Sequence, residues 1–197
     1  MNLKQIIRGS TVVGLGLGFA LTGCGGVEPG DASEPAELGS TEQGINVVTN
    51  SGFESAPAGV YNYTILSTGA TTLTNWTIGS SIKVMHSTYK TPHGGTKSID
   101  LNGYGAGSIS QTIPTVVGAG YTVRFYVSNS PNCVGVSRSA KLTYGPSTAS
   151  FSNTSGSWSL RTYVFNATST STLIKLESTS GGVSCGLAID DLTVDGP

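Results

Sequence analysis

The sequence predicts an all-β protein whose main domain is an antiparallel β-sandwich. From Ile45 onward, short runs of β-branched and aromatic residues recur about every ten residues between turn residues, and no stretch has a helical period. Only 11% of the residues are charged, against about 25% in an average domain, and Ser, Thr, Gly and Asn make up the difference. The clearest alternation is at 121–128, where every second residue is apolar. Residues 45–197 are long enough to form one domain with a real core.

Residues 1–23 resemble a lipoprotein signal peptide. Lys4 and Arg8 form a positive region, and the apolar stretch 11–21 is too short and too rich in glycine for a transmembrane helix. The following 21–24 segment, Leu-Thr-Gly-Cys, resembles the bacterial lipobox, whose cysteine is diacylated before cleavage. We therefore expect acyl chains such as palmitate on Cys24, and hence a stable membrane anchor in the bacterial cell envelope. The alternative is an ordinary signal peptide with a chance cysteine.

The residue after the cysteine bears on location. Gly25, rather than Asp, resembles the sorting pattern for the outer membrane or cell surface if the cell is Gram-negative. The segment 24–44 consists of the lipidated cysteine and then Gly, Pro, Ser, Ala and five acidic residues without a base, which predicts a disordered acidic tether. From residue 44 onward, eight Lys and Arg face six Asp and Glu, a net charge of +2. This mild balance favours neither nucleic acid nor a polyanion as a partner.

The strands are predicted in order along the domain. The segment 55–74 is expected to be a long polar excursion that contains Tyr61, Tyr63, Ile65 and Leu66, and 91–95 is expected to be a loop. The expected strands are 45–49, 75–78, 81–85, 97–101, 107–113, 121–128, 139–144, 158–166, 172–178 and 187–194.

Carboxylates stand in the first and last strand-like segments, 50–54 and 185–194. If these segments lie side by side, Glu54, Asp190 and Asp191 converge, and three like charges need a cation. Carboxylate and backbone oxygens suit Ca²⁺, so a structural calcium site is one expectation. The alternative is that the carboxylates accept hydrogen bonds from turn amides and from Lys or Arg side chains. Strand alternation turns Asp190 toward the core unless a bulge shifts the phase, so which Asp faces an ion stays open.

Six blocks in order resemble a known family. The blocks are 50–54, 76–77 with 82–85, 95–103, 107–113, 120–123 and 189–194. Together they resemble the bacterial choice-of-anchor C proteins, and also the plant cell-wall proteins built on a domain of unknown function that is often described as galactose-binding-like. The resemblance covers essentially all of 45–195. It implies a jelly-roll, galactose-binding-domain-like β-sandwich similar to carbohydrate-binding modules, a surface location and a role in binding wall polysaccharide.

The cysteines agree with this resemblance. Cys133 precedes a Val-Gly pair, and Cys185 with Gly186 comes just before the Asp-Asp pair, as in the plant members. With Cys24 lipidated, two cysteines remain, and an oxidising compartment favours a disulfide between them. We expect a bond from Cys133 to Cys185; the alternative is two free thiols.

A sugar-binding site needs aromatic rings on which the sugar can stack and polar groups that form hydrogen bonds with its hydroxyls. Tyr126 and Arg124 alternate with a plainly apolar face and are the better exposed pair. Trp76 and Trp158 lie in apolar runs, where a tryptophan more often belongs to the core. The candidate ligand-binding residues are Trp76, His86, Asp100, Asn102, Arg124 and Tyr126, with Tyr89, His93 and Tyr104 on the neighbouring loops.

Catalysis is not expected. The sequence has two histidines and lacks a His-Glu-x-x-His pair and a phosphate loop. The predicted function is a surface-anchored lipoprotein whose non-catalytic β-sandwich binds cell-wall or extracellular polysaccharide. The main alternative is a structural or adhesive surface protein without a sugar pocket, and a glycan hydrolase ranks third. The residues leave the glycan and the oligomeric state open.

Overall fold

The computed structural model describes residues 44–57 and 62–197, and these residues form strands with one short 3₁₀ helix. The elements are β1 (Ile45–Asn46), β2 (Tyr63–Ser67), β3 (Thr77–Gly79), β4 (Ser81–His86), β5 (Lys97–Asp100), β6 (Ser108–Pro114), β7 (Gly120–Asn129), η1 (Pro131–Cys133), β8 (Arg138–Tyr144), β9 (Ser147–Asn153), β10 (Ser159–Asn166), β11 (Ser171–Ser178) and β12 (Leu187–Gly196).

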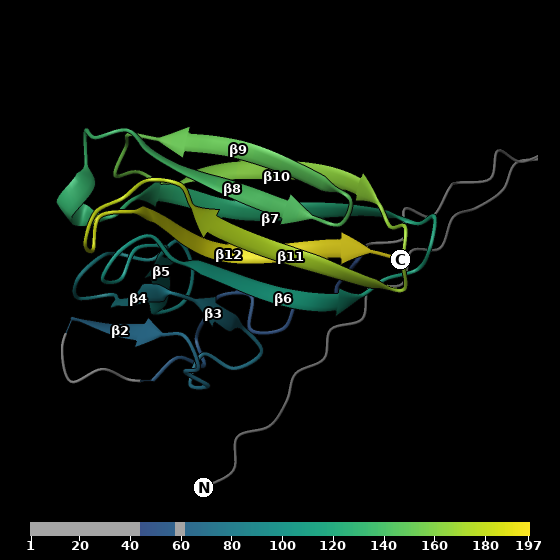
Figure 1. Cartoon of the computed structure of the whole chain (residues 1–197), viewed down its shortest axis with the longest axis horizontal. Helices are drawn as coiled ribbons and strands as arrows, with labels where there is room; N and C mark the ends of the chain where they lie inside the picture. The colour runs from purple at the N-terminus through teal and green to yellow at the C-terminus, as the bar shows by residue number, and fades with distance from the viewer. Residues whose placement is uncertain (1–43, 58–61) are drawn as a thin grey trace, which may run out of the picture. The chain divides into compact units, whose positions relative to one another are not determined.

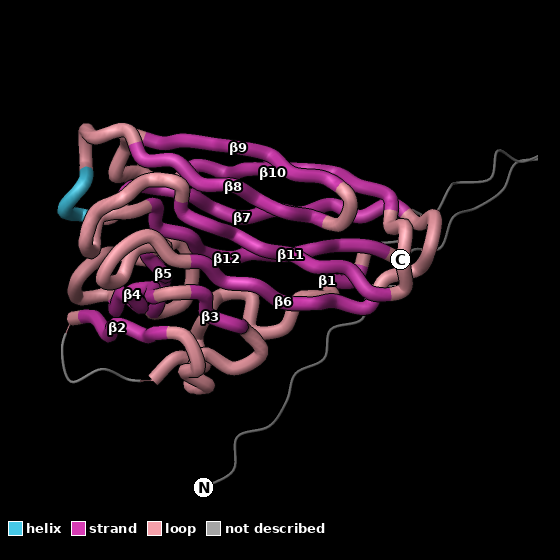
Figure 2. The backbone as a smooth tube through the Cα atoms, viewed as in Figure 1, coloured by secondary structure: helices cyan, strands magenta, loops and turns pink. Residues whose placement is uncertain are grey.

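The strands form two antiparallel sheets (Figures 1 and 2). The larger, called sheet A, has the order β10-β7-β12-β5-β4-β2, with β1 also paired to β12. The smaller, sheet B, has the order β3-β6-β11-β8-β9. Neighbours in each sheet are mostly far apart in the sequence, as in a jelly roll. The predicted all-β jelly-roll sandwich is confirmed.

The last strand, β12, joins the two ends of the domain. It pairs with β7 along one side and with β5 and then β1 along the other. Ile45 lies opposite Gly196, and the Leu192 amide donates to the Ser51 carbonyl at 3.0 Å. The opening and closing segments therefore lie side by side as predicted, but 50–54 forms turns rather than a strand, with Asn50 and Phe53 in left-handed backbone conformations.

The core lies between the two sheets. In β7 the alternate residues Val123, Phe125 and Val127 are fully buried, as the alternating pattern predicts. On the facing side of sheet B, Leu142 and Ile174 are also fully buried. Removing this apolar surface from water is the main stabilising contribution, about 25 cal/mol per Å².

Two strands are not predicted from the sequence. β2 lies inside the segment 55–74 that is predicted as a polar excursion, and β9 falls in a stretch for which no strand is predicted. Both are edge strands, and in β9 only Phe151 is buried. An edge strand with one inward apolar residue has almost no alternation to detect. The first predicted strand, 45–49, is also too long, because β1 covers only two residues.

The predicted signal peptide, Cys24 and the tether before Gly44 lie outside the described residues. Within residues 44–57 and 62–197, none of the helical structure is long or apolar enough to cross a membrane.

Candidate functional site

A β-bulge in β12 decides which way the C-terminal acids point. Asp190 lies opposite Tyr126, but the next pairing is Thr193 with Arg124, so β12 has extra residues at this point. Asp191 takes a left-handed backbone conformation with φ 47°. The bulge puts Asp190 on the same outer face of sheet A as Tyr126, whereas simple alternation predicts the core face.

The two aspartates hold the loop between β4 and β5. One oxygen of Asp190 accepts the amides of His93 at 2.7 Å and of Gly94 at 3.2 Å. A carboxylate oxygen of Asp191 lies 2.6 Å from Nδ1 of His93. A Cβ on Gly94 would lie 2.6 Å from the same Asp191 carboxylate, so only glycine fits this approach. Burial, with the neighbouring charge of Asp191, raises the pKa of Asp190 to about 7.

Glu54 holds the other end of the same loop. Its Oε1 accepts the amides of Thr96 and Lys97, each at 2.9 Å, and its Oε2 accepts the Thr96 hydroxyl at 2.6 Å. Burial acts to raise the pKa of Glu54, but these hydrogen bonds together lower it below its usual value. The three predicted carboxylates do converge, with the loop between them.

Turn amides thus satisfy the carboxylates, as the alternative to calcium anticipates. Among the described residues, no cluster of three or more His, Cys, Asp or Glu is arranged to hold a metal ion. One oxygen of Glu54 and one of Asp190 each accept two backbone amides, and Asp191 contacts His93, so these oxygens are engaged in holding the loop. Calcium binding stays a prediction from the sequence.

An exposed polar and aromatic surface lies over β10, β7 and β12, and we call it the β7 face. The Tyr126 ring is stacked on the His93 ring, with centroids 3.3 Å apart and planes at 14°. Two residues along the strand, Arg124 forms an ion pair with Asp195 at 2.6 Å. The outward residues of the β7 face are Thr122, Arg124, Tyr126, Leu160, Thr162, Val164, Thr193 and Asp195.

The β7 face has a hollow at one end. The hollow has a volume of about 840 Å³, and its polar lining includes Thr122, Arg124 and Asp195. The remaining lining residues are Gly44, Ile45, Gly120, Gly196 and Pro197. A volume of this size is within the usual range for small-molecule sites.

Trp158 lies just before β10, on a partly buried position. Its indole N–H donates to the Thr91 carbonyl at 3.0 Å, and Lys90 Nζ lies 4.7 Å above its ring. Lys90 also donates to the Gly156 carbonyl at 3.1 Å. The loop between β4 and β5 therefore covers two aromatic side chains of sheet A, one with Lys90 and the other with His93.

Three of the predicted ligand residues are inside the protein. Trp76 packs against Phe53 with 4% of its surface exposed, and its indole N–H donates to the Asn50 carbonyl, so it belongs to the core. Asp100 and Asn102 are fully buried. These three cannot contact a glycan on the surface, because their side chains are covered by protein. Of the other predicted ligand residues, Arg124, His93 and Tyr104 are exposed, and Tyr126, His86 and Tyr89 are partly buried.

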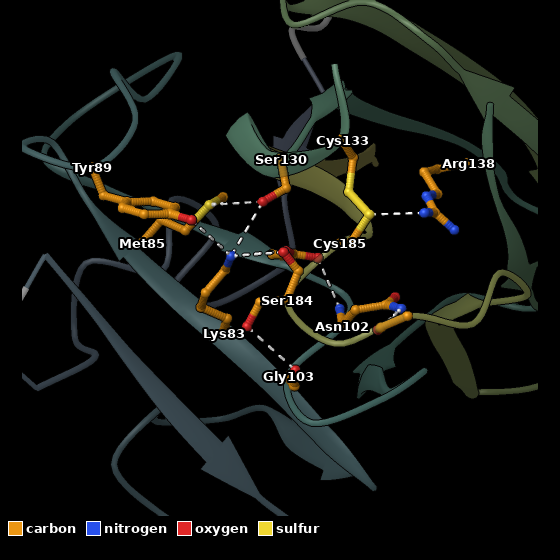
Figure 3. Close-up of polar contacts among 12 residues, drawn as sticks. Lys83, Met85, Tyr89, Asn102, Gly103, Ser130, Cys133, Arg138, Ser184 and Cys185 are labelled. Atoms are coloured by element: carbon orange, nitrogen blue, oxygen red, sulfur yellow. Dashed lines mark hydrogen bonds and ion pairs between the residues drawn. A yellow bond between two sulfur atoms is a disulfide. The ribbon is translucent and has the colours of Figure 1, made fainter. Parts of the chain in front are cut away.

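Asp100 instead pairs with a buried lysine that the sequence pattern did not single out. Lys83 Nζ lies 3.2 Å from Asp100 Oδ2, and both side chains are fully buried. The ammonium also donates to the Ser130 hydroxyl and to the Ser184 carbonyl, each at 3.2 Å, and it lies 4.8 Å from the Tyr89 ring centroid (Figure 3). Three loops meet over this ion pair, so its role is structural.

The predicted disulfide is confirmed. Cys133 in η1 and Cys185 before β12 are bonded, with Cα atoms 5.4 Å apart (Figure 3). Arg138 donates to the Cys185 sulfur at 2.8 Å and to the Gly181 carbonyl at 2.9 Å. The bond joins two of the loops that cover the Lys83 pair.

The fold is a jelly-roll β-sandwich similar to those of carbohydrate-binding modules. Similar solved structures include the CBM22-1 xylan-binding domain of Paenibacillus barcinonensis Xyn10C, with a TM-score of 0.50 and 16% identity over 78% of this chain and 95% of that domain. The arabinose-bound α-L-arabinofuranosidase MgGH51 has a TM-score of 0.52 and 12% identity over 81% of this chain and 27% of the enzyme. At these identities the similarity establishes the fold alone.

The chain belongs to the DUF642 family, described as a protein family of unknown function, whose model matches residues 46–195. This match confirms the resemblance to the domain of unknown function found in plant cell-wall proteins; membership of the choice-of-anchor C group stays a prediction. Halomucin of Haloquadratum walsbyi is 28% identical over 165 residues, which cover 81% of this chain. The chain spans only 2% of the length of halomucin.

Proposed function

We propose that this protein binds polysaccharide through the β7 face, without catalysis, while a lipid on Cys24 anchors it to the bacterial cell envelope. The observation that carries the proposal is the adjacency of an exposed ring stack and a charged pair beside a hollow. The Tyr126 and His93 rings offer a flat apolar surface, and Arg124 and Asp195 offer a donor and an acceptor for hydroxyls.

Two further points support a binding role. The fold is that of carbohydrate-binding modules, and one structural neighbour is named as a xylan-binding domain. Several acidic residues are engaged in holding the fold: Glu54 and Asp190 accept loop amides, and Asp100 pairs with Lys83. Asp195, on the β7 face, pairs with Arg124. Support for the anchor comes from the sequence of residues 1–25.

A glycan array with the purified protein tests the proposal, and calorimetry follows on any glycan that binds. We expect Tyr126→Ala and Arg124→Ala each to weaken binding by about three- to tenfold, since a ring contact or a hydrogen bond at an exposed site contributes about 0.5–1.5 kcal/mol. The matched control is Tyr104→Ala: this candidate from the sequence is 69% exposed, but it lies in the loop between β5 and β6 and is not part of the β7 face. This control should bind as the wild type does.

Two other results would each support a different function. If the wild type binds no glycan but retains an extracellular protein or matrix partner, the adhesive alternative replaces the proposal. Release of reducing sugar from a bound glycan would establish a hydrolase instead.

A further inference from the structure

We infer that the His93 ring, rather than Tyr126, is the surface on which a sugar ring stacks, and that the ligand is an uncharged glycan. This inference rests on the proposed function and specifies the contact residue and the ligand class at the same face.

The first step is access to the two rings. The His93 and Tyr126 rings lie face to face at 3.3 Å, so one face of Tyr126 is already covered. The His93 side chain is 33% exposed. One face of His93 contacts Tyr126 and its Nδ1 edge contacts Asp191, which leaves the opposite face and the Nε2 edge as the parts of the ring outside these two contacts. An incoming sugar therefore meets His93 before it can meet Tyr126.

The second step is rigidity. Asp190 accepts the amides of His93 and Gly94, and Asp191 accepts the Nδ1 proton, so both the backbone and the ring of His93 are held. Glu54 fixes the end of the same loop at Thr96. A ring that is already held in its binding orientation loses little conformational entropy when a ligand binds. Asp191 is thus a positioning residue for the His93 ring.

The third step is charge. The two cationic side chains named at the β7 face already have partners, since Arg124 pairs with Asp195 and Lys90 lies over Trp158. The His93 ring contacts the Asp191 carboxylate. A polyuronate would have to displace these partners and approach two carboxylates. A neutral glycan brings hydroxyls, which donate to a carboxylate and accept from a guanidinium without separating the pair.

The fourth step is the shape of the surface around the ring. Leu160 lies directly opposite Tyr126 in the neighbouring strand and is 48% exposed. Arg124 lies two residues from Tyr126, roughly 7 Å along the strand. The His93 ring therefore has apolar Leu160 as a neighbour on the next strand and the Arg124–Asp195 pair further along β7. This arrangement suits a sugar with one apolar face and polar edges.

The experiment is a set of calorimetric titrations with galactan, arabinan, xylan and polygalacturonate. We expect a neutral polysaccharide to bind, and His93→Ala to weaken that binding about tenfold. Tyr126→Phe keeps the supporting ring and should bind within twofold of the wild type. His93→Phe keeps a flat ring but loses the Nδ1 bond, so it should retain most of the affinity. Tyr104→Ala is the matched control, and melting temperatures show which variants are folded.

Each failure has its own meaning. If the wild type binds none of the four glycans or the array, the proposed function fails. If the wild type binds and His93→Ala binds equally well, the inference that a sugar stacks on His93 is wrong, while the proposed function stands. A His93→Phe variant that is folded but loses as much affinity as His93→Ala would show that the ring face is not the contact. Tighter binding to polygalacturonate than to the neutral chains would overturn the ligand class.

Discussion

Lys83 and Asp100 form a buried ion pair, and the loops that carry Ser130 and Ser184 contact its ammonium group. Both are fully buried, and burial raises the pKa of Asp100 despite the lysine beside it. A buried charge is tolerated only with a partner and further hydrogen bonds, which Ser130 and the Ser184 carbonyl supply here. The pair therefore fixes where the loops that carry these two groups can lie.

Asp100→Asn should destabilise the protein by about 3–5 kcal/mol, because it leaves the Lys83 ammonium buried without a counter-charge. Urea unfolding monitored by tryptophan fluorescence measures the change. The double variant Lys83→Met with Asp100→Leu removes both charges and should lose clearly less than Asp100→Asn alone. A single variant as stable as the wild type would contradict a buried ion pair.

Asp190 should make stability depend on pH. Its folded pKa of about 7 lies above the value near 4 of an unfolded aspartate. The folded state therefore binds more protons between about pH 4 and pH 7, and this residue's contribution to stability falls as pH rises through that window, by at most about 1.4 kcal/mol per pH unit. Above pH 7 its contribution levels off.

The check is denaturant unfolding of the wild type and Asp190→Asn from pH 4 to pH 8. The asparagine oxygen can still accept the His93 and Gly94 amides but does not titrate, so the variant should lack this downward slope. Equal slopes in the two proteins would contradict the raised pKa.

At the scale of elements, the disulfide joins η1 to the start of β12. Its cysteines are 52 residues apart, and closing a loop of this length in the unfolded chain stabilises the fold by about 4 kcal/mol. The Cys133→Ser variant should therefore melt several degrees lower than the wild type. Alkylation of the wild type without reductant should add no mass at Cys133 or Cys185, and labelling of both would contradict the bond.

The loop between β4 and β5 allows a test of metal dependence. Its amides already satisfy Glu54 and Asp190, so we expect a chelator to leave the melting temperature within about 1 °C of its value in buffer, since a shift of several degrees would need about 1 kcal/mol. The measurement is thermal unfolding with EDTA and then with excess Ca²⁺. A fall of several degrees that Ca²⁺ reverses would instead support the calcium site predicted from the sequence.

The elements that the sequence predicts are those with a buried side and an exposed side. β7 shows full alternation and is predicted almost to its ends, and β12 is predicted from its apolar run. β2 and β9 are missed because they lie at the sheet edges, where few side chains are inward. The bulge at Asp191 is also invisible in the sequence, since its effect on direction depends on the register with β7.

At the scale of the whole molecule, the sequence locates the site only in part. Alternation on β7 places Arg124 and Tyr126 on the outer face of sheet A, where Arg124 is exposed and Tyr126 is partly buried, and the predicted carboxylates all contact the loop between β4 and β5. Trp76 and Asp100 look like ligand residues in the sequence, yet contacts from distant segments bury them. The stack of His93 on Tyr126 joins residues 33 positions apart and depends on acids still further along the chain, so no local pattern reveals it.

The anchor and the binding face should be separable functions of one chain. β1 is paired to the end of β12, and the residues that form the β7 face and line its hollow lie at Gly44 and beyond. Cys24→Ser should therefore abolish lipid labelling with radioactive palmitate and release the protein from the membrane fraction. The same variant should keep the melting temperature of the folded domain and its affinity for any glycan that binds the wild type. Palmitate labelling that persists in Cys24→Ser would contradict lipidation at this cysteine, and a loss of glycan binding in the folded variant would show that the N-terminal segment contributes to the site.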